Sequence, residues 1–377
     1  MIILFVVNSP EFFLSHRLPL AVAVRDSGFT VHIATGFGPA CKEIAELGFH
    51  HHLLPIFRSG HNPLCELRTL LGLYRLIKGI KPDLVHLVTI KPVLYGGLLA
   101  RLAGVPAMVA AISGLGTVFI DRKQDRFWII RRVIQWLYRV ALGHSNVKVI
   151  FQNPDDREAL ISISSVRQCK TALIRGSGVS LASCPMRPEP EDVPVVTFAA
   201  RLLEDKGVRE FVEAARVLMR RGVSARFWLA GSLDPGNLTS VSEDVLLKWS
   251  KEEVVEVLGH QSDIPNLFAN SNIVVLPSYR EGLPKVLIEA AACGRAVVTT
   301  DVPGCRDAIE PESTGLLVPV RDPIGLADAI QFLIENPERR KQMGASGRAL
   351  AEREFAIEKV VDAHLAIYRE LTNGTHQ

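Results

Sequence analysis

NIVVLPSYREGLPKVLIEAAACGRAVVTT, residues 272–300, is the stretch that decides the fold of this chain. An apolar run of strand length at 273–276 is followed by a polar exit segment and then by an Ala-rich run that suits a helix. Pro284 fits the first helical turn, where a missing N–H costs nothing, and Gly294 fits the helix stop. A second apolar run follows at 296–300. The order strand, helix, strand predicts a βαβ unit with two parallel strands.

The same alternation runs along the whole chain and predicts an α/β protein with two doubly wound, Rossmann-like domains. Continuous apolar runs separated by helical patterns indicate parallel strands that are covered on both faces. In the first half we expect strands at 2–7, 30–34, 84–88, 107–112, 148–151 and 171–174. In the second half we expect them in VVTFAA, ARFWLAG, VVEVLG, NIVVLP and AVVTT.

A segment rich in proline and charge, SCPMRPEPEDVP at 183–194, interrupts this pattern and predicts a linker. We therefore expect an amino-terminal domain at 1–182 and a carboxyl-terminal domain at 195–354. A last helix at 355–377 is expected to pack back on the first domain. Ligands of such sheets bind outside the carboxyl ends of the strands, so we expect the ligands in a cleft between the two domains.

The charge of the chain is unevenly divided, although the net charge of the 377 residues is only +3. Residues 1–185 carry a balance of +10 and residues 186–377 a balance of −7. This asymmetry predicts an anionic partner for the first half. Anionic lipid, a phosphorylated substrate and nucleic acid are the candidates. Nucleic acid is disfavoured because no nucleic-acid-binding module is recognisable.

Several classes of protein are disfavoured by what the sequence lacks. The start, MIILFVVNSP, has no basic region before its short apolar run, so we interpret it as a buried strand rather than a secretion signal. No apolar stretch is long enough for a transmembrane helix. The six cysteines form no CxxC pair and no cluster with histidine, which favours reduced thiols and gives no metal-ligand set. No phosphate-binding loop of the G-x-x-x-x-G-K-[ST] type is present.

Two glutamates flank the predicted helix start in the opening stretch. Glu281 lies just before the helix, and Glu289 lies about one and a half turns inside it. The N–H groups of the helix start, around Gly282, Leu283 and Pro284, suit an anion, whereas the carboxylates suit sugar hydroxyls. The alternative is a capping Glu281 and a solvated Glu289.

Two cations stand at the end of another predicted strand, in FAARLLEDKGV. Arg201 and Lys206 precede a helix, and the glycine after Lys206 allows close backbone approach, which suits a diphosphate. Gly231 ends the next strand in the same way, in LAGSLD. The alternative is a solvated surface pair.

Taken in order, R-x4-K-G, the glycine after the next strand, GHQSDIPNLF and E-G-L-P-x4-E resemble family-4 retaining glycosyltransferases of the GT-B fold. The resemblance covers the whole chain. VHLVTIKPVLYGGLLARLAGVP and SGLGTVF are similar to the bacterial subgroup that builds polysaccharide or O-antigen repeats on a lipid carrier.

The resemblance implies a role for each of these motifs. Arg201 and Lys206 would hold the donor diphosphate. Glu281 would contact the donor sugar, beside backbone N–H groups from Gly282 onward, and Glu289 would hold the ribose. The family works without a bound metal, so neither a metal nor another cofactor is expected. Retention of configuration would follow from attack on the face that the leaving group departs from.

Three residues of the first half are candidates for the acceptor side of the site. Many relatives carry a histidine where this chain has Ser113, so a catalytic histidine is not supported there. Lys91, in TIKP, follows a strand end and is a second candidate. His16, in FLSHRLP, is the third, and its alternative is an ordinary helix histidine.

The stretch 121–144, DRKQDRFWIIRRVIQWLYRVALGH, predicts a basic amphipathic helix. Arginines and a lysine alternate with tryptophans at helical spacing, which suits an anionic membrane surface or a lipid-linked diphosphate. The alternative is a helix that packs on the core and presents a solvated basic face.

The sequence therefore predicts an enzyme that transfers a sugar, of the N-acetylhexosamine type, from a UDP-sugar to an undecaprenyl-diphosphate-linked saccharide. It would work at the cytoplasmic face of the cell membrane as a peripheral protein. The alternatives are a UDP-sugar 2-epimerase of the same fold and a non-enzymatic protein that binds sugar nucleotides.

Overall fold

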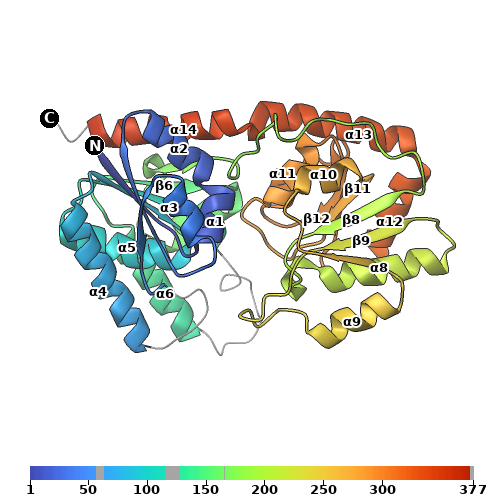
Figure 1. Ribbon diagram of the computed structural model, residues 1–377, viewed down its shortest axis with the longest axis horizontal. Coiled ribbons are helices and arrows are strands. Elements are labelled where there is room, and N and C mark those ends of the chain that lie inside the picture. The colour runs from blue at the N-terminus through green and yellow to red at the C-terminus, as the bar shows by residue number, and fades with distance from the viewer. Residues whose placement is uncertain (57–62, 116–127, 165, 374–377) are drawn as a thin grey trace. The chain divides into compact units, whose positions relative to one another are not determined.

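The computed structural model describes residues 1–56, 63–115, 128–164 and 166–373, without the side chains of 128–131. Two compact units share these residues (Figure 1). Unit 1 comprises Met1–Ser177 and Glu358–Gln377, and unit 2 comprises Gly178–Ile357. The chain therefore passes from one unit to the other twice, after Ser177 and after Ile357. The predicted linker at 183–194 lies within unit 2.

Unit 1 is built on a seven-stranded parallel sheet in the order β3-β2-β1-β4-β5-β6-β7. Continuous apolar runs form its central strands, which are buried along most of their length. The strands are β1 Ile2–Val6, β2 Thr30–Thr35, β3 His50–Leu53, β4 Leu84–Val88, β5 Ala107–Ile112, β6 Val147–Phe151 and β7 Thr171–Leu173.

Helices cover both faces of this sheet (Figure 1). One core cluster joins one face to α4, α5, α6 and α7, and another joins the opposite face to α1, α2 and α14. The helices of unit 1 are α1 Pro10–His16, α2 Leu18–Asp26, α3 Cys41–Glu46, α4 Pro63–Ile80, α5 Ile90–Ala103, α6 Trp128–Ala141, α7 Pro154–Ile163, η3 Gln168–Lys170 and α14 Ile357–Asn373.

Unit 2 is a six-stranded parallel sheet in the order β10-β9-β8-β11-β12-β13, with one large core cluster. Its strands are β8 Val195–Ala199, β9 Arg226–Ala230, β10 Glu256–Gly259, β11 Ile273–Leu276, β12 Ala296–Thr300 and β13 Gly315–Val318. Its helices are η4 Glu204–Lys206, α8 Val208–Arg220, α9 Glu243–Lys251, α10 Ile264–Ala269, α11 Lys285–Ala292, η5 Arg306–Ala308, α12 Pro323–Glu335, α13 Pro337–Leu350 and η6 Ala351–Phe355.

The predicted fold class is confirmed, and the opening stretch folds as expected into β11, α11 and β12. Pro284 is the N-cap of α11, and Gly294 follows its end with φ +70°. The expected strands are all present, with ends shifted by a residue or two. Two edge strands were not predicted. β3 is HHHL, which has only one apolar residue, and β13 is a four-residue run.

Each sheet has a point where the strand order reverses, between β1 and β4 in unit 1 and between β8 and β11 in unit 2. Ligands of open parallel sheets bind at the carboxyl ends of the strands at such points. The loops after these four strands are therefore the places where the fold favours a binding site.

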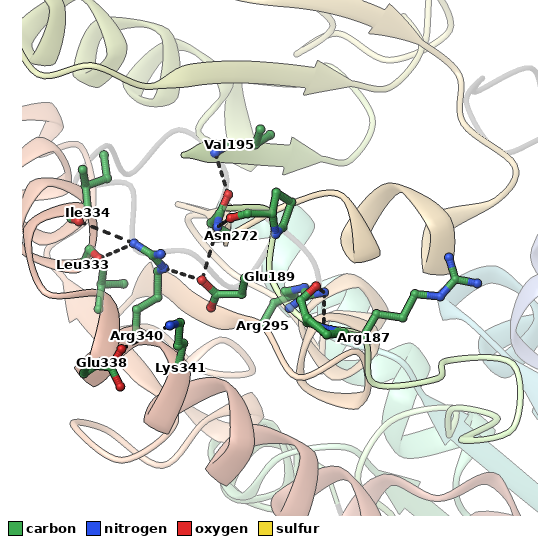
Figure 2. A network of polar contacts seen from close by, with 12 residues as sticks. Arg187, Glu189, Val195, Asn272, Arg295, Leu333, Ile334, Glu338, Arg340 and Lys341 are labelled. Carbon is green, nitrogen blue, oxygen red and sulfur yellow. Dashed lines mark hydrogen bonds and ion pairs between the residues drawn. The ribbon is translucent and has the colours of Figure 1, made fainter. Parts of the chain in front are cut away.

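Buried polar contacts fasten the segment 183–194 to the body of unit 2 (Figure 2). Arg340 Nε donates to Glu189 Oε2 at 2.8 Å, and each of the two side chains is only 6% exposed. Asn272 Nδ2 donates to Pro190 O at 3.0 Å, and Arg295 Nη2 donates to Arg187 O at 2.9 Å. A segment with the composition of a linker is thus held by side chains from β11, β12 and α13 and their flanking residues.

Candidate functional site

In unit 2 the predicted site residues Lys206 and Glu281 are in direct contact. Lys206 follows β8 and Glu281 follows β11, so the pair spans the point of strand reversal. Lys206 Nζ donates to Glu281 Oε1, and Ser278 Oγ donates to the same oxygen at 2.7 Å. The side chains of Lys206 and Glu281 are 21% and 12% exposed. A cation and a carboxylate are thus held together, largely out of water, where the fold favours a ligand.

Close backbone packing brings these two loops together. Gly207 has φ +74°, and a Cβ there would lie 2.1 Å from Pro277 O. Tyr279 N donates to Asp205 O at 2.9 Å, and Ser278 Oγ lies 3.0 Å from the same carbonyl oxygen. Only glycine allows this approach, since a side chain would collide with the neighbouring loop. The glycine of the R-x4-K-G motif is therefore a packing requirement of the site.

Arg201, the second predicted cation, forms an ion pair with Asp234 after β9. Arg201 Nη1 donates to Asp234 Oδ2 at 2.5 Å, and the side chains are 39% and 21% exposed. The loop that carries Asp234 is tied to the β8 loop, because Leu202 N donates to Ser232 O and Val241 N donates to Leu202 O. Gly231 has φ +155°, and a Cβ there would lie 1.9 Å from Ala200 O. Gly231 thus permits the approach of β8 and β9 that sets the ion pair.

Glu289 lies on α11 and is 14% exposed. Lys285, one turn earlier, holds its carboxylate at 3.1 Å. Burial raises the pKa of Glu289, and the charge of Lys285 opposes that shift. Gly282, Leu283 and Pro284 are buried between Glu281 and the helix start. Glu289 is thus largely buried and paired with Lys285. Its ribose-binding role stays a prediction.

The acceptor candidates of unit 1 lie in two places. Lys91 and Ser113 follow the neighbouring strands β4 and β5. Lys91 Nζ donates to Glu66 Oε1 at 2.7 Å. His16 is the last residue of α1, and the contacts described for it are local: Ser15 Oγ lies 2.6 Å from its Nδ1, and its ring stacks on Phe12. The structure therefore brings Lys91 and Ser113 to one edge of the sheet, and the acceptor role of each of the three residues stays a prediction.

The predicted basic helix at 121–144 is described only in part. Residues 121–127 lie outside the described residues, and α6 covers 128–141. Val133 and Trp136 on α6 are 50% and 60% exposed, whereas Tyr138 is buried in the core. This helix both packs on the core and presents apolar side chains to solvent.

Sequence reasoning missed the residues that pair with the predicted cations. Asp234 and Glu66 lie 33 and 25 residues from their partners in sequence. Asp234 occurs in a polar loop and Glu66 in an amphipathic helical stretch, so neither stood out. The position of Asp234 in LAGSLD, just after a strand end, was the one usable signal.

No helix among the described residues is long and apolar enough to cross a membrane. In the same residues, no group of three or more histidine, cysteine, aspartate or glutamate side chains is arranged to hold a metal. The expectation that the enzyme works without a metal stays a prediction.

The chain has two Rossmann-like units, and one of them carries cations and carboxylates at its strand reversal. This arrangement is typical of α/β proteins that bind nucleotide-linked ligands. Two family models match the chain. The model described as "Glycosyl transferase 4-like" matches residues 2–153, and the model described as "Glycosyl transferases group 1" matches residues 185–350. The chain belongs to this family of glycosyltransferases, and the predicted resemblance is confirmed.

Named relatives and solved structures agree with this assignment. The chain is 30% identical, over 87% of its length and 90% of the relative, to the N,N'-diacetylbacillosaminyl-diphospho-undecaprenol alpha-1,3-N-acetylgalactosaminyltransferase of Campylobacter jejuni. It is 26% identical, over 68% of its length and 67% of the relative, to the Escherichia coli UDP-Gal:alpha-D-GlcNAc-diphosphoundecaprenol alpha-1,3-galactosyltransferase. The structure of Anabaena HepE in complex with UDP-glucose matches with a TM-score of 0.76 and 19% identity, over 99% of this chain and all (100%) of the other. The fold is therefore that of the GT-B glycosyltransferases, and the protein is an enzyme of this class.

Proposed function

We propose that this glycosyltransferase moves an N-acetylhexosamine from a UDP-sugar to an undecaprenyl-diphosphate-linked saccharide, during the synthesis of a surface polysaccharide or O-antigen. The contact between Lys206 and Glu281 carries the proposal. At the point of strand reversal it places a cation, which suits a phosphate, beside a carboxylate, which suits sugar hydroxyls. The two relatives named above act on undecaprenyl-diphosphate-linked sugars, and one of them transfers N-acetylgalactosamine.

In this proposal unit 2 binds the donor. Arg201 and Lys206 receive the diphosphate, with the backbone around Gly282, Leu283 and Pro284 beside it, and Glu289 holds the ribose. Glu281 contacts the donor sugar. The ion pairs with Asp234 and Glu281 support these roles, because they keep both cations oriented at the strand ends before a ligand arrives.

The proposed reaction retains the configuration of the donor sugar. The bond between the anomeric carbon and the β-phosphate oxygen breaks, and a bond to an acceptor hydroxyl oxygen forms on the same face. The hydroxyl proton passes to the departing phosphate oxygen. Arg201 and Lys206 stabilise the negative charge that develops on UDP as it leaves, which is the usual role of preorganised cations in group transfer.

We also propose that the enzyme works as a peripheral protein on the cytoplasmic face of the membrane that holds its acceptor. The exposed apolar side chains of α6 support this, together with Leu64, Leu67 and Leu71 on α4, which are 67%, 52% and 46% exposed. Arg68 and Arg132 lie on the same two helices and are exposed. Apolar and basic side chains on one helix suit an anionic lipid surface.

A transfer assay tests the proposal. Purified enzyme is incubated with a farnesyl-diphosphate-linked N-acetylhexosamine and, in turn, with UDP-GalNAc, UDP-GlcNAc, UDP-galactose and UDP-glucose. Mass spectrometry of the acceptor should show the gain of one N-acetylhexosamine, with one UDP released per product. Conversion of the donor to its 2-epimer with an unchanged acceptor would favour the epimerase instead, and an unchanged donor would favour a protein that only binds sugar nucleotides.

A further inference from the structure

A buried serine of unit 2 contacts the carboxylate of Glu281. Ser278 lies two residues after the end of β11 and is 0% exposed. Its Oγ lies 2.7 Å from Glu281 Oε1 and 3.0 Å from Asp205 O. A serine hydroxyl has a single proton and can donate only one full hydrogen bond. The proton of Ser278 therefore goes either to the carboxylate or to the backbone carbonyl.

The carboxylate is the better acceptor of this proton. A hydrogen bond to an ionised acceptor is roughly twice as strong as one between neutral groups. Asp205 O also accepts a hydrogen bond from Tyr279 N at 2.9 Å, so it does not need the hydroxyl. A hydroxyl turned toward Asp205 O would leave two oxygens, Ser278 Oγ and Glu281 Oε1, in close contact with no hydrogen between them. Ser278 Oγ thus donates to Glu281 as long as the carboxylate is ionised.

The two carboxylate oxygens of Glu281 differ in their contacts. Lys206 Nζ and Ser278 Oγ both donate to Oε1. Oε2 has no partner among the described residues, and it is not closed off from solvent. Each carboxylate oxygen has two lone pairs, so these two donors saturate Oε1. Oε2 is therefore the oxygen that can accept a hydrogen bond from a ligand.

The backbone around this carboxylate is fixed from the neighbouring strand exit. Glu281 N donates to Pro303 O at 3.2 Å. Gly304 has φ +83°, and a Cβ there would lie 2.5 Å from Glu281 O. Thr300 Oγ1, at the end of β12, donates to Ser278 O. Rotation of the Glu281 side chain is thus the main freedom that the loop leaves, and the two donors to Oε1 restrict it.

We propose that Ser278 is a positioning residue for the transfer reaction. Its hydroxyl, together with Lys206, holds Oε1 of Glu281, so that Oε2 is the oxygen that accepts a hydrogen bond from a hydroxyl of the donor sugar. The inference rests on the proposed function, because it takes Glu281 as the group that contacts the donor sugar. It adds which oxygen makes that contact and which side chain orients it.

The test compares two buried serines at opposite ends of β11 in the full-length enzyme. Ser278→Ala removes the donor to Glu281 with little change of shape. Ser271→Ala is the matched control, because Ser271 precedes β11 and is also 0% exposed. Its Oγ donates to Leu267 O at 2.8 Å and lies 2.6 Å from Thr197 Oγ1. Initial rates use the UDP-N-acetylhexosamine that gives product with the farnesyl-diphosphate-linked acceptor, and calorimetry gives the dissociation constant of UDP.

Ser278→Ala should lower kcat/KM about tenfold, as expected for the loss of one hydrogen bond to a charged group. The dissociation constant of UDP should stay that of wild type, because UDP lacks the sugar that Oε2 contacts. Ser271→Ala should keep the wild-type kcat/KM, although it also loses a buried hydroxyl. Ser278→Cys keeps a group of similar size that donates only weakly, so it supplies the same test if Ser278→Ala does not fold.

A double variant separates positioning from a structural role. If Ser278 acts only through Glu281, its hydroxyl has nothing to orient once the carboxylate is gone. Ser278→Ala combined with Glu281→Ala should therefore have the same kcat/KM as Glu281→Ala alone. Independent effects on the site would instead multiply, because the free energies of uncoupled substitutions add.

Two results would overturn the inference while wild-type enzyme still transfers sugar. One is a kcat/KM equal to wild type in both Ser278→Ala and Ser278→Cys. The other is a double variant about tenfold slower than Glu281→Ala, which would mean that Ser278 acts by another route, such as its contact with Asp205 O. A wild-type enzyme that neither transfers sugar nor binds UDP would remove the proposed function, and the inference with it.

Discussion

The two strand-end edges of this enzyme are built in opposite ways. In unit 2 the charged groups at the edge are already paired, Lys206 with Glu281 and Arg201 with Asp234. In unit 1 the side-chain oxygens of Asn8, Thr89 and Ser113, which follow β1, β4 and β5, are buried and have no hydrogen-bond partner among the described residues. In a partly buried site an unpaired charge costs more than an unpaired hydroxyl. The two edges thus differ in whether the chain itself satisfies their polar groups.

The paired edge also explains how unit 2 can be preorganised. Each cation is held by a carboxylate on a different strand exit, so its position is set before the proposed diphosphate ligand arrives. Such preorganisation removes the need to reorient the groups during the reaction.

Replacing Glu281 should have the largest effect on catalysis. Glu281→Gln keeps the shape of the side chain but removes its charge, so Lys206 loses its partner and the donor sugar loses its carboxylate. We expect kcat/KM to fall by about 10²–10³-fold, the range for one preorganised group in an active site. The melting temperature should stay close to that of wild type. Glu338→Gln, at an exposed position on α13, is the matched control. Wild-type turnover with a lowered melting temperature would make Glu281 a structural residue.

Removing either cation should weaken binding of the donor diphosphate. Lys206→Ala and Arg201→Ala each lose a charge-assisted contact of about 1.5–3 kcal/mol, so affinity for UDP and for inorganic pyrophosphate should fall about 10- to 150-fold. Uridine should bind almost as it does to wild type, since it lacks the phosphates. Calorimetry with the three ligands measures this, with Arg221→Ala as a control at an exposed ion pair. An equal loss for uridine would remove these residues from the diphosphate site.

Mild acid should destabilise unit 1 before unit 2. Burial, followed by the charge of Arg17, lowers the pKa of His364 to about 3, and burial, followed by the charges of His364 and Arg17, lowers the pKa of His86 well below 6.5. In the unfolded chain the two histidines bind protons near pH 6.5, whereas in the folded chain they do not. The contribution of the two neutral histidines to the free energy of unfolding is therefore complete above pH 6.5. It falls by up to about 1.4 kcal/mol per histidine for each pH unit below that value.

Pulse proteolysis in urea at pH 7 and pH 5, with fragments identified by mass spectrometry, separates the two units. Fragments of unit 1 should appear at lower urea at pH 5, because residues 178–357 contain one histidine, His260, and unit 1 contains the others. His364→Gln should reduce the pH dependence, whereas His260→Gln should not. Equal shifts of both units would show that these histidines do not set the response.

The smallest expected effect concerns the membrane surface. Arg132→Gln on α6 should reduce binding to anionic vesicles about fivefold, because each basic residue near such a surface contributes about 1 kcal/mol. Arg220→Gln, an exposed arginine of unit 2, is the matched control. Co-sedimentation at low and high salt measures both. Wild-type protein that stays in solution at low salt would contradict membrane binding by this helix.

The sequence predicts the central part of the fold and the position of Lys206 and Glu281 after two neighbouring strands of unit 2. Runs such as 84–88 and 107–112 are apolar throughout because both of their faces are buried, and this makes them visible in the sequence. β3 escaped prediction because an edge strand can consist of HHHL. The charge-rich segment at 183–194 has the composition of a linker, and its contact with Arg340, 151 residues later, leaves no local signal.

Charged residues at strand ends were predictable where a motif and a strand end coincide, as at Arg201 and Glu281. The partners of Arg201 and Lys91 were not predictable, since Asp234 and Glu66 meet them only through the tertiary fold. The positive φ of Thr89 could not be found either, because a backbone conformation of this kind cannot be read from TIKP.

The central claim is that the edge of unit 2 binds the donor and the edge of unit 1 binds the acceptor. Initial rates over a grid of UDP-N-acetylhexosamine and farnesyl-diphosphate-linked acceptor concentrations test it for wild type, Lys206→Ala and Ser113→Ala. We predict that Lys206→Ala raises KM for the donor alone and that Ser113→Ala raises KM for the acceptor alone, each by about tenfold. A Ser113→Ala enzyme with a raised donor KM and an unchanged acceptor KM would contradict this division of the site.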